Sequence, residues 1–351
     1  MAHEADNWLD PESELALRST VPEVMGGRSL ALYARWWQLE TWLRDLIYVE
    51  FRAAFGVQWS THVDSTYRQS QDANQLRHMH SPDVDNPLAY LDSKKLLDLI
   101  ATHWFKFQDS LIDLNAWNGR QDELQKIRHR IMHLRKPHSD DLRRIEQTLR
   151  DLERGAFTAL AAYTRRYTPA RDGHSDPVTD AWIHRKHPRA YLIQHAETQY
   201  EANITFEVSK RPWLPEVPPE LDRAPGILWH FGLMFRNRTI NPRRIWLEVD
   251  DPTFRTMLVH LSIYDPYHIE FTFSAADDGR DIVNAIRYAF EASLASSRRV
   301  HDVKEVDYEG VSRAARDLDF RVLSESRWNI VSDSTIPISI FGSGGSVISS
   351  P

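Results

Sequence analysis

Residues 30–55 read LALYARWWQLETWLRDLIYVEFRAAF, and this stretch decides the fold of the N-terminal half. Ser29 before it is a good N-cap residue, and Gly56 after it is typical of a helix C-terminus. Apolar side chains recur along the stretch at steps of three and four residues, as on one buried face of a helix. They are Leu32, Trp36, Leu39, Leu43, Leu46 and Ile47. The stretch therefore predicts one long helix with a single packed face.

The residues that follow predict three further helices. A polar segment at 57–86 precedes the second helix, which begins near Pro87 because proline suits a first helical turn. Its apolar residues keep the same spacing, namely Leu97, Ile100, Trp104, Phe107, Leu111 and Leu114. The Asn118-Gly119 pair predicts a turn that ends this connection.

A third helix is predicted over 121–135, where Pro137 stops it. Ser139 is expected to cap a fourth helix that runs to about Tyr167, with acidic residues in its first turn, where the helix dipole favours them. Four helices joined by short connections predict an up-and-down bundle.

Beyond residue 177 the spacing of apolar residues changes from helical to alternating, which is typical of strands. Asp265-Pro266 predicts the turn of a hairpin between two of these strands. The expected strands are 204–208, 257–263 and 269–273, with 227–235 and 245–249 as further candidates. A helix is expected over 282–294 and a weaker one over 308–318.

The predicted fold class is therefore a multidomain protein, with an N-terminal all-α up-and-down bundle followed by an α+β domain with antiparallel strands. We expect an N-terminal arm at 1–28, a helical domain at 29–167 and a linker at 168–177. An α+β domain with a sensor or regulatory role is expected at 178–325, and a flexible Gly/Ser-rich tail at 326–351.

The composition excludes several classes of site. The chain has 351 residues and no cysteine, so disulfides, thiolate zinc sites and cysteine nucleophiles are excluded. The N-terminus is acidic and lacks the apolar core of a secretory signal, and no apolar stretch is long enough to span a membrane. We therefore expect a cytoplasmic protein. Its net charge of −7 argues against a general nucleic-acid binder.

One segment departs from this average charge. Residues 126–138 read KIRHRIMHLRKPH and hold five Lys/Arg and three His without an acid. Because a helix turns about 100° per residue, His129 and His133 share a face, whereas Arg128 and His133 are about 140° apart. Arg128 and His133 can therefore converge only if the helix is distorted or if two copies of it meet.

This segment resembles the signature of the HEPN superfamily. That signature is an arginine, a polar residue, three further residues and a histidine, here Arg128, His129 and His133, late in a helical bundle. A first helix with an acidic and then a basic residue, Glu40 and Arg44, is also similar. The resemblance covers roughly residues 29–167 and implies metal-independent RNA cleavage in a homodimer, by attack of the ribose 2′-OH to leave a 2′,3′-cyclic phosphate. No cofactor is implied.

On this resemblance His133 would be the general acid/base, because histidine titrates near neutral pH, and Arg128 would hold the phosphate. His129 would orient His133 or carry a second proton. Arg130, Arg135 and Lys136 would attract the RNA backbone. For Glu40 two possibilities stay open, a carboxylate that pairs with Arg128 or, as we favour from the sequence, an exposed surface acid.

The same resemblance suggests a toxin or anti-phage effector, with an antitoxin or activating ligand as a possible further partner. Other interpretations of the sequence stay open. The chain can be a non-catalytic dimerisation or binding module that presents its C-terminal domain to a protein or RNA partner. His129 and His133 can be a zinc pair, although no third ligand is evident. A second basic run at 184–189 can be a solvated segment or an extension of an RNA path, and Gly342–Gly345 lacks the rest of a phosphate-binding loop.

Overall fold

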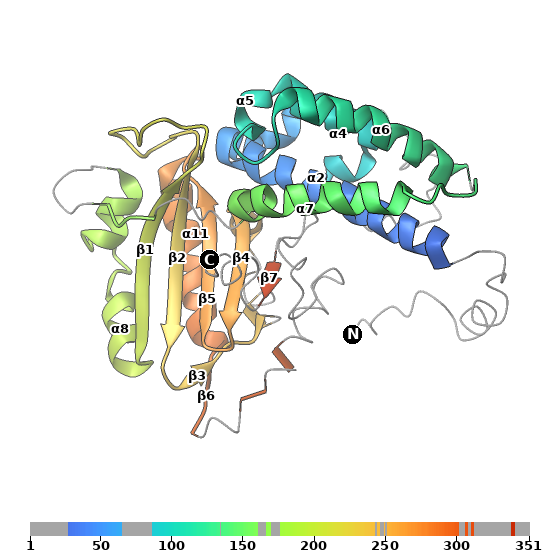
Figure 1. The fold of residues 1–351 in the computed structure, drawn as a ribbon. Coiled ribbons are helices and arrows are strands. Elements are labelled where there is room, and N and C mark those ends of the chain that lie inside the picture. The colour runs from blue at the N-terminus through green and yellow to red at the C-terminus, as the bar shows by residue number, and fades with distance from the viewer. Residues whose placement is uncertain are drawn as a thin grey trace, which may run out of the picture. The chain divides into compact units, whose positions relative to one another are not determined.

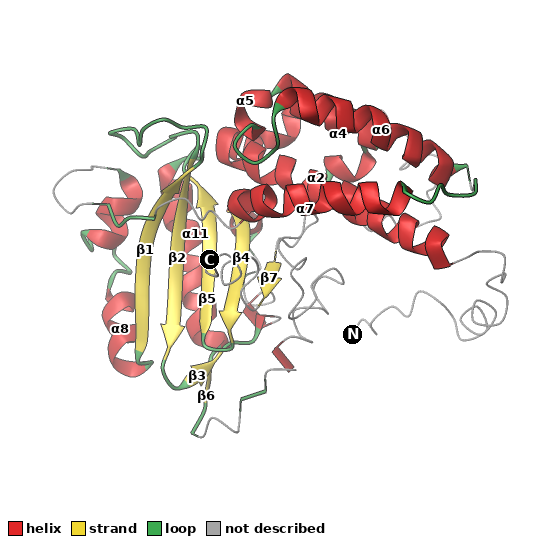
Figure 2. Ribbon diagram, in the orientation of Figure 1, coloured by secondary structure: helices red, strands yellow, loops and turns green. Residues whose placement is uncertain are grey.

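The computed structural model describes residues 27–64, 86–133, 135–160, 166–169, 176–242 and 251–301, with short stretches at 244–245, 249, 306–307, 310–311 and 338–340. Helices make up its N-terminal region, and a sheet with antiparallel strands and helices makes up its C-terminal region (Figure 1; Figure 2). The predicted fold class is therefore confirmed in this order of an all-α and an α+β region. The predicted arm up to residue 26, most of the helix at 308–318 and the tail after residue 340 lie outside the described residues.

The first helix, α2, spans Gly27–Phe55 and changes character along its length. Between Leu32 and Leu39 the buried residues recur at steps of three and four, with more exposed residues between them. One face of the helix is therefore packed, as the sequence predicts. From Asp45 to Ala54 every side chain is buried, although this part carries charged residues. A helix buried all round lies in the interior of a packed unit, which the apolar spacing alone does not indicate.

The predicted second helix is divided into shorter pieces. After a 3-10 turn at Gly56–His62 (η1), the chain forms a second 3-10 turn at Pro87–Tyr90 (η2), helix α4 at Ser93–Thr102 and helix α5 at Trp104–Phe107. The prediction of a continuous helix to residue 114 was wrong. His103 leaves the helical conformation (φ −109°, ψ 27°) and interrupts the helix there. The regular spacing of apolar residues continues across this interruption and therefore does not reveal it.

The predicted turn at Asn118-Gly119 was also wrong, because both residues lie inside helix α6, which spans Leu114–Met132. The Asp113 carboxylate caps this helix by accepting a hydrogen bond from Asn115 N at 2.9 Å. Trp117, Leu124 and Ile127 form its buried face. An N-cap and a buried stripe together outweigh one glycine, whose helix propensity is about 1 kcal/mol below that of alanine.

Replacing Gly119 by alanine should therefore stabilise the protein by roughly 0.5–1 kcal/mol. A Cβ atom at this position would have no neighbour within 4 Å, so the substitution introduces no clash. Urea denaturation of both proteins measures the difference. A Gly119→Ala variant that is less stable than the parent would contradict the helical assignment of this residue.

Helix α7 spans Asp141–Leu160 and begins two residues after Ser139, the predicted cap. Its first turn contains Asp141, as predicted. Tyr167 was predicted as the end of this helix, but it forms an antiparallel bridge with Val208 instead. The chain has therefore left the helix before it reaches the sheet.

The sheet has the order β1-β2-β5-β4-β7, and neighbours among the first four strands are antiparallel. The strands are β1 at Ala202–Lys210, β2 at Ile227–Phe235, β4 at Leu258–Asp265, β5 at His268–Ser274 and β7 at Ile338–Ile340. The β4–β5 hairpin is the one predicted around Asp265-Pro266. β7 runs parallel to β4, and a separate two-stranded ribbon pairs β3 at Arg238–Thr239 with β6 at Arg298–Arg299.

The apolar face of the sheet packs against helices. The ring centroid of Phe231 in β2 lies 5.1 Å from that of Phe290 in helix α11. Helix α11 spans Gly279–Ser296, which confirms the helix predicted over 282–294. Helix α8 at Tyr191–Gln199, a π-helical turn at Thr179–Ile183 (η3) and helix α10 at Pro252–Met257 complete this region. Of the strand predicted over 245–249, residues 246–248 lie outside the described residues, while Ile245 is helical and its carbonyl accepts a hydrogen bond from Val249 N, which does not fit a strand at these two positions.

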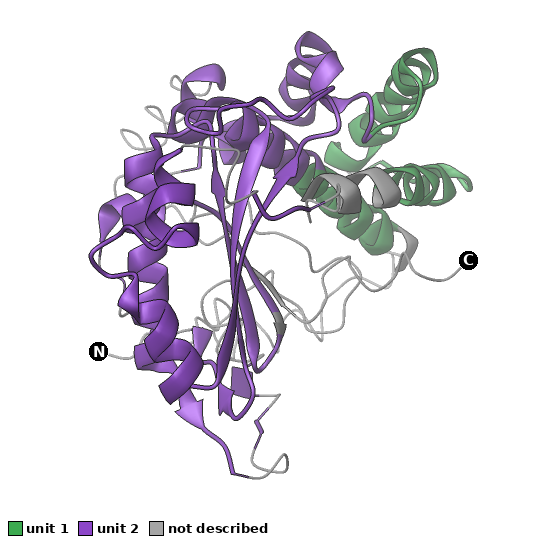
Figure 3. Cartoon of the chain, turned by 90° about the vertical axis from the view of Figure 1, so that its left-hand side faces the viewer, with its two compact units in different colours: residues 1–42, 111–153 green, residues 43–110, 154–351 purple. Residues whose placement is uncertain are grey.

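The chain divides into two compact units (Figure 3). One comprises residues 1–42 and 111–153, and the other comprises 43–110 and 154–351. This division differs from the predicted one, because α2 contributes its first half to one unit and its second half to the other. In the second unit Arg52 of α2 donates to the carbonyls of Thr256 and Met257 at 3.0 and 2.9 Å. The C-terminal half of α2 thus belongs with the sheet.

Candidate functional site

The signature residues lie at the C-terminal end of α6. Arg128 and His129 belong to its last turns, and His133 is the C-cap residue, whose backbone N–H donates to the carbonyl of His129. Arg128 is half-buried, with 29% of its side chain exposed, whereas His129 and His133 are exposed. All three residues therefore lie where α6 ends. Arg128 is on one side of the helix, and His129 and His133 are on another.

Arg128 faces helix α2. Its Nε lies 3.8 Å from Oε1 of Glu40, whose side chain is only 16% exposed. Trp36, one turn earlier in α2, donates from Nε1 to the same oxygen at 2.8 Å. This is the Glu40–Arg128 pairing that we held to be the weaker possibility from the sequence. Trp36 was missed, although its spacing of four residues from Glu40 on a predicted helix is a usable signal.

The guanidinium of Arg128 keeps an unused donor. Within the described part of the chain, no acceptor forms a hydrogen bond with the buried Nε atom of Arg128. A buried N–H without a hydrogen bond is unfavourable, because desolvation of the donor is not offset. The 29% of the Arg128 side chain that remains exposed can still approach an anionic group.

His129 and His133 form an aromatic pair. Their ring centroids are 4.3 Å apart and the rings are inclined by 61°. Partial desolvation, followed by the nearby His133 and Arg135, lowers the pKa of His129 from its ordinary value. The lowered pKa favours the neutral form of His129, in which an imidazole nitrogen can accept a proton.

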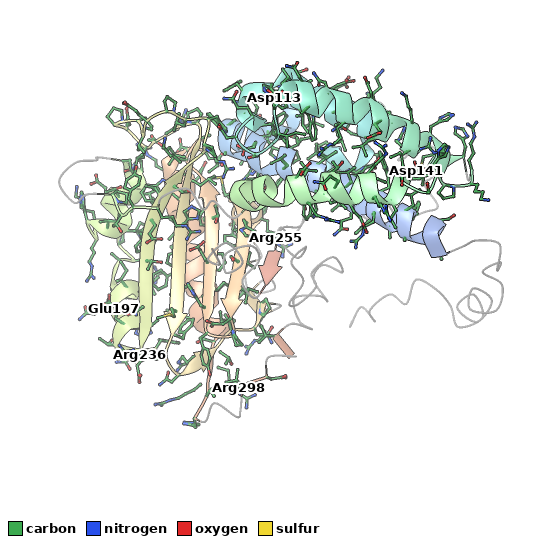
Figure 4. All side chains as sticks on the ribbon, viewed as in Figure 1. Asp113, Asp141, Glu197, Arg236, Arg255 and Arg298 are labelled. Carbon is green, nitrogen blue, oxygen red and sulfur yellow. The ribbon has the colours of Figure 1, made fainter. Side chains whose placement is uncertain are left out.

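Arg130 has a structural partner. It forms a bidentate ion pair with Asp141, which is buried at the start of α7 (Figure 4). Asp141 also accepts a hydrogen bond from His138 N at 2.9 Å. Burial alone would raise the pKa of Asp141, but the hydrogen bonds from Arg130 and His138 outweigh it, so the pKa is lowered. Asp141 was not singled out in the sequence, and it fixes the turn that follows the signature.

Arg135 and Lys136 continue the basic segment beyond the end of α6. Both side chains are exposed, and neither forms an ion pair with a described residue. Lys126, one turn before Arg130, is exposed as well. These cations therefore face solvent next to His129 and His133, where they can attract a polyanion.

The other residues considered in the sequence have internal partners. In the second basic run, Lys186 binds Asp180 at 2.8 Å and Arg185 lies 3.8 Å from Glu197, which indicates a solvated, paired segment. In the sheet, His230 is buried between the hydroxyls of Ser209 at 2.7 Å and Thr272 at 3.1 Å. Gly342–Gly345 lie outside the described residues.

Two kinds of feature are absent from the described residues. They contain no cluster of three or more His, Cys, Asp or Glu side chains suited to a metal ion, so the pair of His129 and His133 has no third ligand there. No helix in the described ranges is long and apolar enough to cross a membrane.

Comparison of the chain with family models, with curated proteins and with solved structures finds no match in any of the three. The site must therefore be interpreted from its own residues and from the resemblance of its signature.

Proposed function

We propose that the protein is a metal-independent endoribonuclease of HEPN type, with Arg128, His129 and His133 at its active site. The observation that carries the proposal is the meeting of three features at the end of α6. Arg128 has an unused buried donor, His129 and His133 form an exposed pair, and no acidic side chain occurs between residues 126 and 138. This combination suits cleavage of RNA, in which the ribose 2′-OH beside the phosphodiester is the nucleophile.

The chemistry needs only proton transfer and charge stabilisation. A neutral histidine takes the proton from the ribose 2′-OH, and the 2′-oxygen attacks phosphorus. A protonated histidine then supplies a proton to the departing 5′-oxygen. We assign these proton transfers to the pair of His133 and His129. The Arg128 guanidinium binds the phosphate oxygens as negative charge develops on them, and the products are a 2′,3′-cyclic phosphate and a 5′-OH.

The position of Arg128 favours a site shared by two copies of the chain. Arg128 faces α2, whereas His129 and His133 are exposed to solvent. On α2, Leu30, Tyr33 and Trp37 are 45%, 57% and 47% exposed. Steps of three and four residues place them on one face of the helix, and a further step of three reaches Glu40. A second copy bound to this apolar stripe would therefore lie beside the Glu40–Arg128 pair.

Introducing a charge into this stripe should weaken the homodimer. Aromatic residues at the centre of an interface contribute on the order of 2 kcal/mol, so Trp37→Glu should raise the dimer Kd by roughly 30-fold or more. Light scattering coupled to gel filtration measures the mass over a range of concentrations. Tyr191→Glu, which alters an equally exposed aromatic residue of α8, is the control and should remain a dimer. A parent protein that is monomeric at all concentrations would contradict the shared site.

The rival function is a non-catalytic dimerisation or binding module. The apolar stripe on α2 fits this function equally well, because it does not depend on the histidines. The two functions differ in what happens to RNA. A module that binds a protein or RNA partner would leave RNA uncleaved, and substitution of His133 would leave its properties unchanged.

Incubation of the purified chain with a single-stranded RNA in EDTA tests the proposed function. We expect fragments that end in a 2′,3′-cyclic phosphate, and no cleavage of the matched DNA strand, which lacks the 2′-OH nucleophile. RNA that stays intact in EDTA and in magnesium, with the dimer present, would reject the nuclease. A role in toxin action or phage defence, with regulation through the sheet region, is a further part of the proposal that rests on the resemblance alone.

A further inference from the structure

A small cavity of about 230 Å³ lies in the sheet region, beside the ribbon formed by β3 and β6. It is smaller than the roughly 300–1,000 Å³ of pockets that hold drug-sized ligands, so its size suits a small metabolite. Its polar lining residues are Thr239, Asn241, Arg244, Ser296, Arg298 and Asp307.

Two arginines in this lining are free to bind an anion. Arg244 and Arg298 are both exposed, and neither guanidinium has an ion-pair partner within the described ranges. Thr239 stands directly opposite Arg298 in the ribbon, so their side chains share a face, and both line the cavity. Two guanidinium forks at one cavity match the oxygens of a phosphate group.

The surroundings of the cavity are unusually basic for a chain whose net charge is −7. In the ribbon Arg238 stands opposite Arg299, a like-charge pairing that is unfavourable unless something else compensates it. Arg238 is compensated by its position 4.2 Å above the Tyr200 ring. Arg236, which Figure 4 shows with Arg298 at this end of the sheet region, is exposed as well.

The remaining polar groups indicate what else the ligand carries. Thr239, Asn241 and Ser296 provide hydroxyl and amide groups, which suit the hydroxyls of a sugar. Asp307, whose Oδ1 accepts a hydrogen bond from Gly310 N at 2.7 Å, can also accept one from a hydroxyl but repels a bare anion. We propose that this cavity binds a small sugar phosphate, with the phosphate held by Arg244 and Arg298 and the hydroxyls by the polar groups around them.

Calorimetric titration of the full chain with ribose 5-phosphate tests this site. We expect binding that weakens at least tenfold in Arg298→Gln and in Arg244→Gln, and that is unchanged in Arg236→Gln, an exposed arginine outside the lining. Ribose alone and inorganic phosphate should each bind at least tenfold more weakly than ribose 5-phosphate. The thermal midpoints of the variants should match that of the parent, because all three side chains are exposed.

Four results would overturn the proposal, and the first three concern small ligands. These are no binding of ribose 5-phosphate, equal binding by parent and Arg298→Gln, or inorganic phosphate binding as tightly as ribose 5-phosphate. An RNA oligonucleotide that binds through Arg298 while ribose 5-phosphate does not would also overturn it, since the ribbon would then belong to an RNA surface. Each result is independent of RNA cleavage, because none of these residues belongs to the proposed active site.

Discussion

Replacing His133 by alanine should lower the rate of RNA cleavage by about 100-fold or more, because general acid–base catalysis by a positioned side chain contributes roughly 10²–10⁴-fold. Arg128→Ala should have an effect of similar size, since it removes the cation that binds the phosphate in the transition state. Single-turnover rates on a labelled RNA in EDTA measure both effects.

The control for this prediction is His138→Ala. His138 is an exposed histidine of the same basic segment, but it lies beyond the end of α6, and its hydrogen bonds with Asp141 are made by its backbone N–H and carbonyl. Replacing His138 by alanine should leave the cleavage rate within a few-fold of that of the parent. If His133→Ala and His138→Ala cleave RNA at the same rate as the parent, the histidine at 133 has no catalytic role.

Replacing Glu50 by glutamine should destabilise the protein by about 3–5 kcal/mol, the usual effect of removing one partner of a buried ion pair. Glu50 and Arg211 are both fully buried and form a bidentate pair, and Trp213 Nε1 donates to Glu50 at 2.7 Å. Glutamine preserves the shape of the side chain but leaves the charge of Arg211 uncompensated. The free energy of unfolding in urea measures the loss.

Two further variants separate this effect from general sensitivity to substitution. Glu50→Leu combined with Arg211→Met removes both charges and should destabilise the protein less than Glu50→Gln alone. Glu197→Gln breaks an exposed pair with Arg185 and should change stability by less than about 1 kcal/mol. A Glu50→Gln variant as stable as Glu197→Gln would show that the buried pair has no special importance.

The sequence predicts those parts of the fold that depend on local patterns. The long first helix, the hairpin around Asp265-Pro266 and the helix over 282–294 follow from the spacing of apolar residues, and all three are present. Breaks in a helix follow from backbone geometry at single residues. For that reason the interruption at His103 and the uninterrupted helix through Gly119 were both missed.

The candidate site shows the same limit. The helix that carries the signature was predicted to end at Arg135, three residues beyond its observed end at Met132, and the closeness of His129 to His133 follows from their spacing along it. Contacts between helices depend on packing that spacing does not specify. The approach of Glu40 to Arg128 was therefore only one of two possibilities, and the pairing of Arg130 with Asp141 was not foreseen.

The division of α2 between two compact units has a consequence for how this protein can be inherited. A gene fragment that starts after the predicted linker at 168–177 would encode the described strands but would lack Glu50 and Arg52. Arg211 would then be buried without its carboxylate, and the carbonyls of Thr256 and Met257 would lose their donor. Recombination at this position would therefore yield a sheet region that lacks these buried interactions and is less stable than the same region in the full chain. We expect exchange between genomes to favour transfer of both halves of the chain together.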